Sequence, residues 1–253
     1  MPSSNRIALV TGGSRGLGRN TCEQLARRGL DVILTYHRRD DEATEVVSRL
    51  RAQGRQAAAL PLDCGDSTLF SGFAQAVQST LTEFGASRFD VLVNNAGISH
   101  HAAFSDALEQ DLDALYRIHF KGVYLLTQQL LPLLSDGGHI VNISSGLTRI
   151  IYPGSSAYAA MKGAVEILSR YQAKELGPRR IRVNVVAPGA VQTDFSGGIV
   201  RDDPVVNRRI SAVTALGRPG LPEDIGPMIA SLVSEDNRWI NAQRIEVSGG
   251  MAI

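Results

Sequence analysis

The sequence is poor in several features that mark large classes of protein. Its 253 residues include only two cysteines, Cys22 and Cys64, and these show neither C-x-x-C nor metal-ligand spacing. We therefore expect two unpaired thiols in a reducing compartment. The formal net charge is only +1, which argues against a broad electrostatic attraction to nucleic acid or to an acidic membrane.

Long apolar runs are also lacking. No stretch of the sequence approaches the roughly 20 apolar residues that a membrane-spanning helix needs. The opening residues, MPSSNRIALVTGG, carry neither the basic segment nor the apolar core of a secretory signal. We therefore expect a cytoplasmic protein whose partners include neither membrane nor nucleic acid.

What the sequence does contain is a regular alternation of short β-rich runs and longer stretches with helical spacing. The β-rich runs are RIALVT (6–11), DVILTY (31–36), AAALPL (57–62), DVLVNN (90–95), HIVNIS (139–144), IRVNVV (181–186) and QRIEVS (243–248). Apolar strands that alternate with crossover helices predict a parallel sheet covered on both faces. We expect one α/β domain over residues 1–253, a Rossmann-type doubly wound sheet of about seven strands with helices on both faces.

One segment interrupts this alternation. Residues 194–221, DFSGGIVRDDPVVNRRISAVTALGRPGL, contain no expected strand and several glycines and prolines. A long insertion after the carboxyl end of a strand is where a substrate lid would lie. The alternative is an ordinary pair of short helices on the surface.

A glycine-rich turn follows the first expected strand. In ALVTGGSRGLG, glycines stand at positions 12, 16 and 18. Glycine lets the backbone turn tightly and bring amide N–H groups toward an anion, and the next helix N-terminus adds partial positive charge. Placed between a strand and a helix, this turn predicts a dinucleotide site; the alternative is a purely structural turn.

The end of the second expected strand favours NADP(H) over NAD(H). An acidic residue there would bind the ribose hydroxyls of NAD and repel a 2′-phosphate. The sequence instead has Tyr36 near that position, then Arg38 and Arg39, while Arg15 lies inside the glycine turn. A guanidinium suits a phosphate because it offers paired N–H donors. The alternative is that Arg38 and Arg39 only begin a solvated helix, with the two aspartates that follow neutralising part of the patch.

Tyr158 and Lys162 stand four residues apart in AYAAMKG, at the start of an expected helix. Residues at this spacing lie one turn apart on the same helical face. The pair is therefore either a surface phenol beside a surface amine, or a proton donor beside the cation that lowers its pKa.

Several further motifs occur in a fixed order. They are TGGSRGLG (11–18), LD (62–63), NNAG (94–97), NISS (142–145), YAAMK (158–162) and VNVVAPGAVQT (183–193). This series resembles the short-chain dehydrogenase/reductase family over nearly the whole chain. IRVNVVAPG and EVSGGMAI look most like its 3-oxoacyl-[acyl-carrier-protein] reductase group.

The resemblance implies catalytic roles that the chemistry supports. Ser145 lies 13 residues before Tyr158, the family's spacing, and would donate a hydrogen bond to the substrate carbonyl oxygen. Tyr158 would protonate that oxygen as hydride arrives from the nicotinamide. Lys162 would lower the pKa of Tyr158 and hold the nicotinamide ribose.

The matching segments would also hold the cofactor. The LD segment would meet the adenine, the NNAG segment would form the floor beneath the cofactor, and the PGAVQT segment would hold the nicotinamide carboxamide. The implied cofactor-binding residues are Gly12, Ser14, Arg15, Gly16, Leu17, Gly18, Tyr36, Arg38, Asp63, Cys64, Asn94, Ala96, Gly97, Tyr158, Lys162, Pro188, Gly189, Val191 and Thr193. The two asparagines of NNAG could also cap strand ends with their side-chain amides.

The sequence departs from the family pattern at His119. Many members carry a catalytic asparagine in a pattern like N-x-x-G-V, whereas this chain reads YRIHFKGVYLLTQ. In relatives the asparagine helps to hold a water that links the lysine to solvent. We expect His119 to occupy this relay site, where an imidazole could also change charge near pH 6.5. The alternative is a packed histidine with the water held by other groups.

Two adjacent histidines, His100 and His101, follow NNAGIS. Loops at the carboxyl ends of strands line the site in such sheets, so one of the two could touch substrate. We expect no metal, because no third ligand is evident and ketone reduction in this family needs none.

The resemblance favours an NADPH-dependent reductase of a 3-oxoacyl thioester, in fatty-acid or polyketide biosynthesis, with an acyl carrier protein as possible partner. Arg179 and Arg180 could contribute to a basic docking surface, but the SDGG turn before HIVNISS lacks an expected basic residue. The excursion adds arginines and aspartates that could be merely solvated. A reductase or dehydrogenase of a free ketone, sugar or secondary alcohol, and a low-turnover dinucleotide-binding sensor or structural subunit, remain as alternatives.

Relatives in the family are usually homotetramers, and we expect the same here. In VYLLTQQLLPLL, apolar residues lie on nearly every side of the expected helix, more than a singly covered helix needs.

Overall fold

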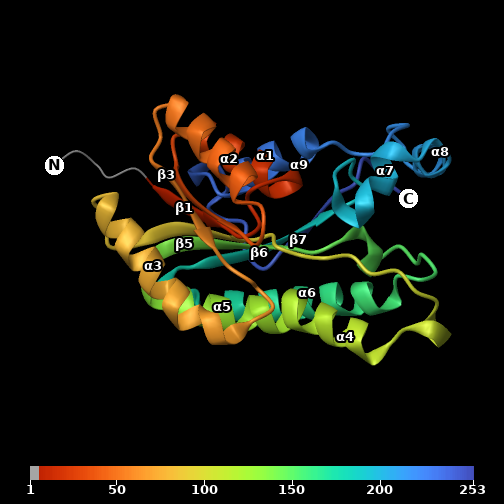
Figure 1. The fold of residues 1–253 in the computed structure, drawn as a ribbon, viewed down its shortest axis with the longest axis horizontal. Helices are drawn as coiled ribbons and strands as arrows, with labels where there is room; N and C mark the ends of the chain where they lie inside the picture. Colours follow the sequence, from red (N-terminus) through yellow and green to blue (C-terminus); the bar gives the residue numbers. More distant parts are fainter. Residues whose placement is uncertain (1–5) are drawn as a thin grey trace.

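The computed structural model describes residues 6–253, and within them seven parallel strands form one central sheet (Figure 1). The strands are β1 (Ile7–Val10), β2 (Asp31–Tyr36), β3 (Ala57–Pro61), β4 (Phe89–Asn94), β5 (Leu134–Ile143), β6 (Arg182–Pro188) and β7 (Arg244–Val247). Their order across the sheet is β3-β2-β1-β4-β5-β6-β7. The predicted doubly wound α/β fold is confirmed, with the change of winding direction between β1 and β4, where such sheets bind ligands beyond the carboxyl ends.

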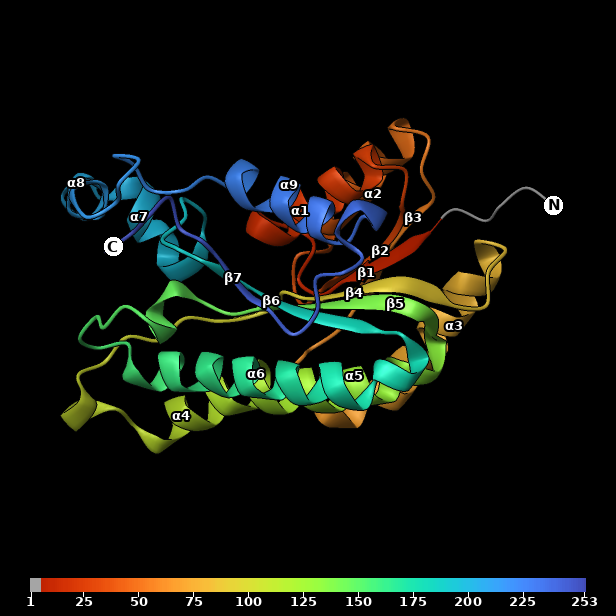
Figure 2. The ribbon, with the colours of Figure 1, turned by 180° about the vertical axis from the view of Figure 1, so that it is seen from behind.

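Helices cover both faces of the sheet. They are α1 (Gly16–Arg27), α2 (Asp40–Ala52), α3 (Phe70–Glu83), α4 (Glu109–Tyr116), α5 (Val123–Leu130), α6 (Ser156–Glu175), α7 (Ile199–Asp202), α8 (Pro204–Ala212) and α9 (Pro222–Leu232). The views from the two sides show α1, α2 and α9 on one face and α3 to α6 on the other (Figures 1 and 2). Each layer encloses its own hydrophobic cluster against the sheet, which is why the strands are apolar on both faces.

Two local features differ from a plain alternation. The segment SDGG lies inside β5 as a bulge, because Phe89 pairs with Leu134 whereas Val91 pairs with His139. On the face of the sheet covered by α3 to α6, a π-helical turn, Arg117–Gly122, joins α4 to α5. Such turns often mark functional sites, and this one contains His119.

The excursion at 194–221 forms short helices and no strand, as the sequence indicates. A 3-10 turn, Phe195–Gly198, leads into α7 and α8, which lie beyond the carboxyl ends of the strands near the C-terminus (Figure 1). Isolated bridges fix its base, one between Val191 and Gly220 and one between Thr214 and Met251.

The expectation of two unpaired thiols is confirmed. Cys22 is buried and Cys64 half-buried, and both thiols are free. Within residues 6–253, no helix has the length and apolar character to cross a membrane. The same residues contain no cluster of three or more His, Cys, Asp or Glu side chains arranged to hold a metal ion.

Candidate active site

The glycine turn has the strained geometry that its spacing predicts. Gly12 and Gly16 have φ of +65° and +53°, values that side chains other than glycine rarely adopt. A Cβ at Gly18 would lie 2.1 Å from the carbonyl oxygen of Gly12, so only glycine lets helix α1 approach the turn. Helix α1 starts at Gly16, and its first N–H groups are therefore available to an anion.

The arginines near the glycine turn differ in whether they form ion pairs with other side chains. Arg39 pairs with Glu42 at 2.7 Å. Arg15 and Arg38 are exposed, and neither guanidinium has an ion pair with another described residue. His37 lies 3.5 Å from Asp63, which places the LD segment beside the end of β2. The structure thus leaves two cations free at the predicted 2′-phosphate position.

The NNAG segment is tied to the glycine turn through its second asparagine. The Asn95 side-chain amide donates to the carbonyl oxygens of Thr11 at 2.9 Å and Gly12 at 3.1 Å. The Thr11 hydroxyl in turn accepts from the backbone N–H groups of Asn95 and Ala96. The PGAVQT segment reaches the same turn, because a Cβ at Gly16 would lie 3.5 Å from the Thr193 side chain.

The first asparagine of NNAG instead builds a buried polar network. The Asn94 amide donates to Asn142 at 2.8 Å and to the Thr127 hydroxyl at 3.0 Å. The Asn142 amide donates to Ser169 at 2.8 Å and Gln172 at 3.0 Å. Strands β4 and β5 are thereby joined to α5 and α6, so the side-chain amides of NNAG have the structural role that the sequence left open.

The predicted catalytic side chains converge at the carboxyl end of β5. Ser145 follows that strand, and its side chain is near enough to Tyr158 to lower the pKa of the phenol. The Lys162 ammonium lies 5.7 Å from the centre of the Tyr158 ring, and Nζ donates to the carbonyl oxygen of Ile143 at 2.7 Å. Lys162 is only 5% exposed. The interpretation as a solvated surface pair is therefore wrong.

The pKa of the phenol differs from the expectation. Burial raises the pKa of Tyr158 above its ordinary value, and the hydrogen bond from Ser145 only partly opposes this rise. Burial also lowers the pKa of Lys162 to about 7, so the amine is only partly charged at neutral pH. The chain's own groups therefore keep Tyr158 protonated, which suits a proton donor in reduction.

His119 is buried against the catalytic tyrosine. Its ring lies edge-on to Tyr158 with 5.1 Å between centroids. Nε2 lies 2.7 Å from the carbonyl oxygen of Ile98 and 3.3 Å from the Ile98 backbone nitrogen. Because a carbonyl oxygen can only accept and its contact is the shorter, we assign the proton to Nε2. Burial, followed by the charge of Lys162, lowers its pKa to about 3 despite the opposing hydrogen bond to Ile98. The expected change of charge near pH 6.5 is therefore wrong. Nδ1 is buried and has no hydrogen-bond partner among the described residues, so the ring keeps one neutral, unpartnered acceptor next to Gly97.

The two adjacent histidines lie in the loop after β4 with different neighbours. His100 lies 3.4 Å from Asp111, whereas the exposed ring of His101 packs 5.9 Å from the ring of Tyr152. Gly154 has φ of +86°, which favours glycine, and it is joined to the loop after β4 because its carbonyl oxygen accepts from the Ala102 N–H at 3.0 Å. The loops after β4 and β5 are thus clamped together next to the site.

The predicted docking arginines lie at the other end of the sheet. Arg179 Nε donates to Asp136 at 2.7 Å, and its terminal nitrogens donate to the carbonyl oxygens of Leu131 and Leu134 at the start of β5. Helix α6 has 20 residues and is therefore roughly 30 Å long, which separates Arg179 and Arg180 from Tyr158. The expectation that they flank the site entrance is wrong.

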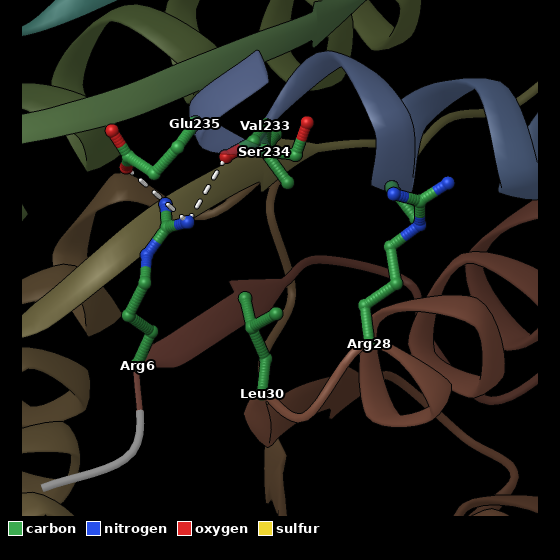
Figure 3. A pocket seen from close by; sticks show the side chains of 7 residues that line it. Arg6, Arg28, Leu30, Val233, Ser234 and Glu235 are labelled. Carbon is green, nitrogen blue, oxygen red and sulfur yellow. Dashed lines mark hydrogen bonds and ion pairs between the residues drawn. The ribbon is translucent and has the colours of Figure 1, made fainter. Parts of the chain in front are cut away.

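A cavity of about 260 Å³ lies elsewhere in the described chain, and none of the catalytic side chains lines it. Figure 3 shows the side chains that do. Its lining residues are Arg6, Arg28, Leu30, Ala230, Val233, Ser234 and Glu235. Arg6 and Leu30 directly precede β1 and β2, so this cavity opens at the amino ends of the strands.

Sequence reasoning missed three residues beside the site. Glu166 and Arg244 form an ion pair at 2.8 Å behind Ser145, and Phe195 from the excursion lies 6.1 Å from the Tyr158 ring, centre to centre. Glu166 stands one turn after Lys162, a signal that could have found it. Nothing local in the sequence links Arg244 or Phe195 to the site.

The chain belongs to the short-chain dehydrogenase/reductase family and is an oxidoreductase. The family model described as Enoyl-(Acyl carrier protein) reductase matches residues 12–252. Because this match spans almost the whole described chain, the resemblance carried by the motifs is confirmed.

Similar proteins share the full length of the chain. An uncharacterized oxidoreductase of Methylorubrum extorquens is 37% identical over 248 residues, which cover 97% of each chain. The hydroxynaphthalene reductase-like protein Arp2 of Metarhizium brunneum is 31% identical, covering 98% of this chain and 95% of its own. Among solved structures, the angucycline C-6 ketoreductase LanV with bound NADP is 34% identical with a TM-score of 0.92, covering 98% of this chain and 95% of that chain.

Proposed function

We propose that this protein is an NADPH-dependent ketoreductase that reduces a free ketone on a bulky, apolar ring system. The observation that carries ketone reduction is the convergence of Ser145, protonated Tyr158 and buried Lys162 beside a glycine turn. LanV, with its bound NADP, and the hydroxynaphthalene reductase-like protein support the same reaction type.

The residues present fit the dinucleotide. Positive φ at Gly12 and Gly16 and the close approach at Gly18 shape a cradle that a Cβ would fill. Arg15 and Arg38 are the free cations that would hold a 2′-phosphate. Asn95, which follows β4, and Thr193, which follows β6, support this cradle. When bound, the reduced nicotinamide supplies hydride.

The chain's own residues would handle the proton. Ser145 would donate a hydrogen bond to the ketone oxygen and stabilise its developing negative charge. Tyr158, kept protonated by burial, would donate its proton to that oxygen. Lys162 would steady the resulting phenolate, because a charged ammonium close to the ring favours the ionised form. His119 would accept a hydrogen bond at Nδ1 and so hold the polar path behind Tyr158.

The surroundings of Tyr158 favour an apolar ring substrate. Phe195 stands 6.1 Å from the Tyr158 ring, and aromatic rings at such distances attract further flat rings. The loops after β4 and β5 expose Phe104 and Ile151, each 87% exposed, together with Tyr152. A contiguous patch of exposed apolar side chains often marks a binding surface.

A second candidate is reduction of a 3-oxoacyl thioester carried by an acyl carrier protein. The matching family, Enoyl-(Acyl carrier protein) reductase, supports it because its name specifies a thioester on such a carrier. The placement of Arg179 and Arg180 at the opposite end of the sheet removes one argument for carrier docking. The arginines of the excursion are in part paired, since Arg201 contacts Asp194 and Asp202.

Two further features belong to this proposal. The excursion at 194–221 would act as the substrate lid, because Phe195 faces Tyr158 while α7 and α8 lie beyond the sheet (Figure 2). A homotetramer would cover the apolar side chains exposed on α5 and α6, which include Tyr124, Ile167 and Tyr171.

Steady-state oxidation of NADPH at 340 nm tests the proposal with 2-tetralone and an acetoacetyl thioester. We expect kcat/KM for 2-tetralone to be at least about tenfold higher, and Phe195→Ala to raise its KM about tenfold through lost ring contact. Trp239→Ala, which removes a 96% exposed aromatic side chain outside the excursion, is the matched control and should leave KM unchanged. Turnover of the thioester alone would reject the ring ketone in favour of the second candidate. No turnover despite NADPH binding would indicate a low-turnover sensor.

A further inference from the structure

A network of two glutamates and two arginines lies behind the loop that carries Ser145. Arg244, the first residue of β7, donates from Nε to Glu166 at 2.8 Å and from Nη1 to Glu246 at 3.1 Å. Glu246 also accepts two hydrogen bonds from Arg149, at 2.8 and 2.6 Å. The Arg149 hydrogen bonds lower the pKa of Glu246 to about 2, so this carboxylate is charged throughout the working range. We call these four residues the charged frame.

The charged frame holds most of residues 144–149, the serine loop. The hydroxyls of Ser144 and Thr148 both donate to one oxygen of Glu166 at 2.7 Å. Arg244 Nη2 donates to the Thr148 hydroxyl at 3.0 Å and to the carbonyl oxygen of Ser145 at 3.3 Å. With side chains only 18% and 26% exposed, Glu166 and Arg244 interact more strongly than a surface pair would.

The four side chains of the charged frame form no hydrogen bond with the Ser145 hydroxyl itself. The frame touches Ser145 through the carbonyl oxygen, whereas Ser145 Oγ accepts from the Leu147 N–H at 3.2 Å and lies near enough to Tyr158 to lower the pKa of the phenol. The orientation of this hydroxyl therefore depends on where the loop backbone lies.

The frame also reaches the C-terminal strap, residues 248–252. Arg149 donates to the carbonyl oxygens of Met251 at 2.8 Å and Ala252 at 3.1 Å. The strap pairs in turn with the base of the excursion, because Ala215 N–H donates to Gly250 and Ala252 N–H donates to Val213. One chain segment thus supports the serine loop on one side and the excursion on the other.

We propose that Glu166 and Arg244 are positioning residues that set the Ser145 hydroxyl opposite Tyr158, and that the pair Arg149–Glu246 extends this support to the strap. This inference rests on the proposed ketone reduction at Tyr158. The frame touches no reacting atom, and its effect is to hold the loop in the one geometry that stabilises charge on the ketone oxygen. Small misplacements of such groups reduce rates by about a hundredfold.

The test compares Glu166→Gln, Arg244→Met and the double variant with Arg179→Met. Arg179 is the matched control because it makes a similar set of contacts, to Asp136 and two carbonyl oxygens, at the opposite end of the sheet. We expect kcat for 2-tetralone to fall about ten- to a hundredfold in each frame variant, with an unchanged KM for NADPH. The double variant should lose no more than about the larger single loss, because the two side chains act as one unit. Arg244→Lys should recover part of the activity by restoring the charge.

Hydrogen exchange followed by mass spectrometry gives a readout that needs no turnover. Peptides covering 144–149 should exchange at least about tenfold faster in both frame variants and at the parent rate in Arg179→Met. Unchanged exchange in this loop would overturn the inference whether or not any ketone is reduced. Faster exchange with parent-like kcat would overturn it as well, while leaving the proposed function intact. Failure of the parent protein to reduce any ketone, with faster exchange in the variants, would reject the proposed function and retain the positioning of the loop.

Discussion

The two ends of the sheet each bury a neutral histidine, and the two rings hold their protons in opposite places. At the carboxyl end, the shortest contact of His119 Nε2 is to the carbonyl oxygen of Ile98, which can only accept, so Nδ1 is left as an unpartnered acceptor. Toward the amino end, His139 lies 2.9 Å from the amide nitrogen of Asn184. That nitrogen can only donate, so His139 Nε2 accepts and Nδ1 carries the proton.

This difference shows that burial alone does not define a functional histidine. Both rings are almost fully buried, and burial lowers both pKa values. His139 completes a polar contact between β5 and β6, whereas the His119 ring packs edge-on against the ring of the catalytic tyrosine. The neighbours of each ring decide which one belongs to the chemistry.

The largest effect should come from removing the proton donor at the carboxyl end. We expect Tyr158→Phe to lower kcat about 10³-fold, because general acid catalysis is lost, while the melting temperature stays within a few degrees. Tyr171→Phe, further along the same helix and exposed, is the control and should retain parent kcat. Parent-like turnover by Tyr158→Phe would remove the basis for treating this end as the active site.

A smaller effect should appear in the KM for NADPH, and it compares the unpaired Arg38 with Arg39, which is paired with Glu42. Arg38→Ser should raise KM for NADPH about tenfold and leave KM for NADH unchanged, because one charge-assisted contact to phosphate is lost. Arg39→Ser should change neither value, since Arg39 is held by Glu42. Equal effects of the two substitutions on KM for NADPH would contradict the assignment of Arg38.

The smallest effect should be the loss of folding stability in acid that each buried histidine causes. Measuring this loss compares His119 with His139 directly. Both have pKa values lowered by burial, so only the unfolded chain takes up their protons as the pH falls below about 6.5. The stabilisation is present above that pH, and about 2 kcal/mol per histidine should be lost between pH 7 and pH 5. For His119 the loss continues toward its folded pKa of about 3.

Urea unfolding at pH 7 and pH 5 measures this loss in the parent, His119→Asn and His139→Asn. Each substitution should reduce the difference in unfolding free energy between the two pH values. Only His119→Asn should also change kcat. An equal change of kcat in both variants would show that the contrast between the two ends is mistaken.

Much of this molecule could be predicted from its sequence because the relevant signals are local. The seven strands follow from short apolar runs, and Ser145, Tyr158 and Lys162 follow from fixed spacings along one loop and one helix. The free thiols and the glycine geometry at Gly12 are confirmed for the same reason. In each case the residues that determine the feature are close together in the chain.

The errors concern quantities that depend on distant residues. Arg179 was expected near the entrance because it follows the catalytic helix, but the length of α6 carries it to the far end. The pKa values of His119 and Tyr158 depend on enclosure by other elements, which spacing does not report. Arg244 pairs with Glu166 across 78 residues, and no periodic pattern connects them.

The amide network between β4 and β5 has a consequence for how the chain reaches this geometry. Asn94 and Asn142 are direct neighbours across the two strands. A shift of β5 by one residue would turn Asn142 to the opposite face of the sheet. The buried amides would then lack hydrogen-bond partners, which costs about 1–3 kcal/mol of stability for each group. A misaligned sheet is therefore rejected before it can persist. The two side-chain amides fix where β4 and β5 end relative to each other, and so where the loops that follow them begin. The relative position of the catalytic residues in these loops is therefore already determined when the two strands pair.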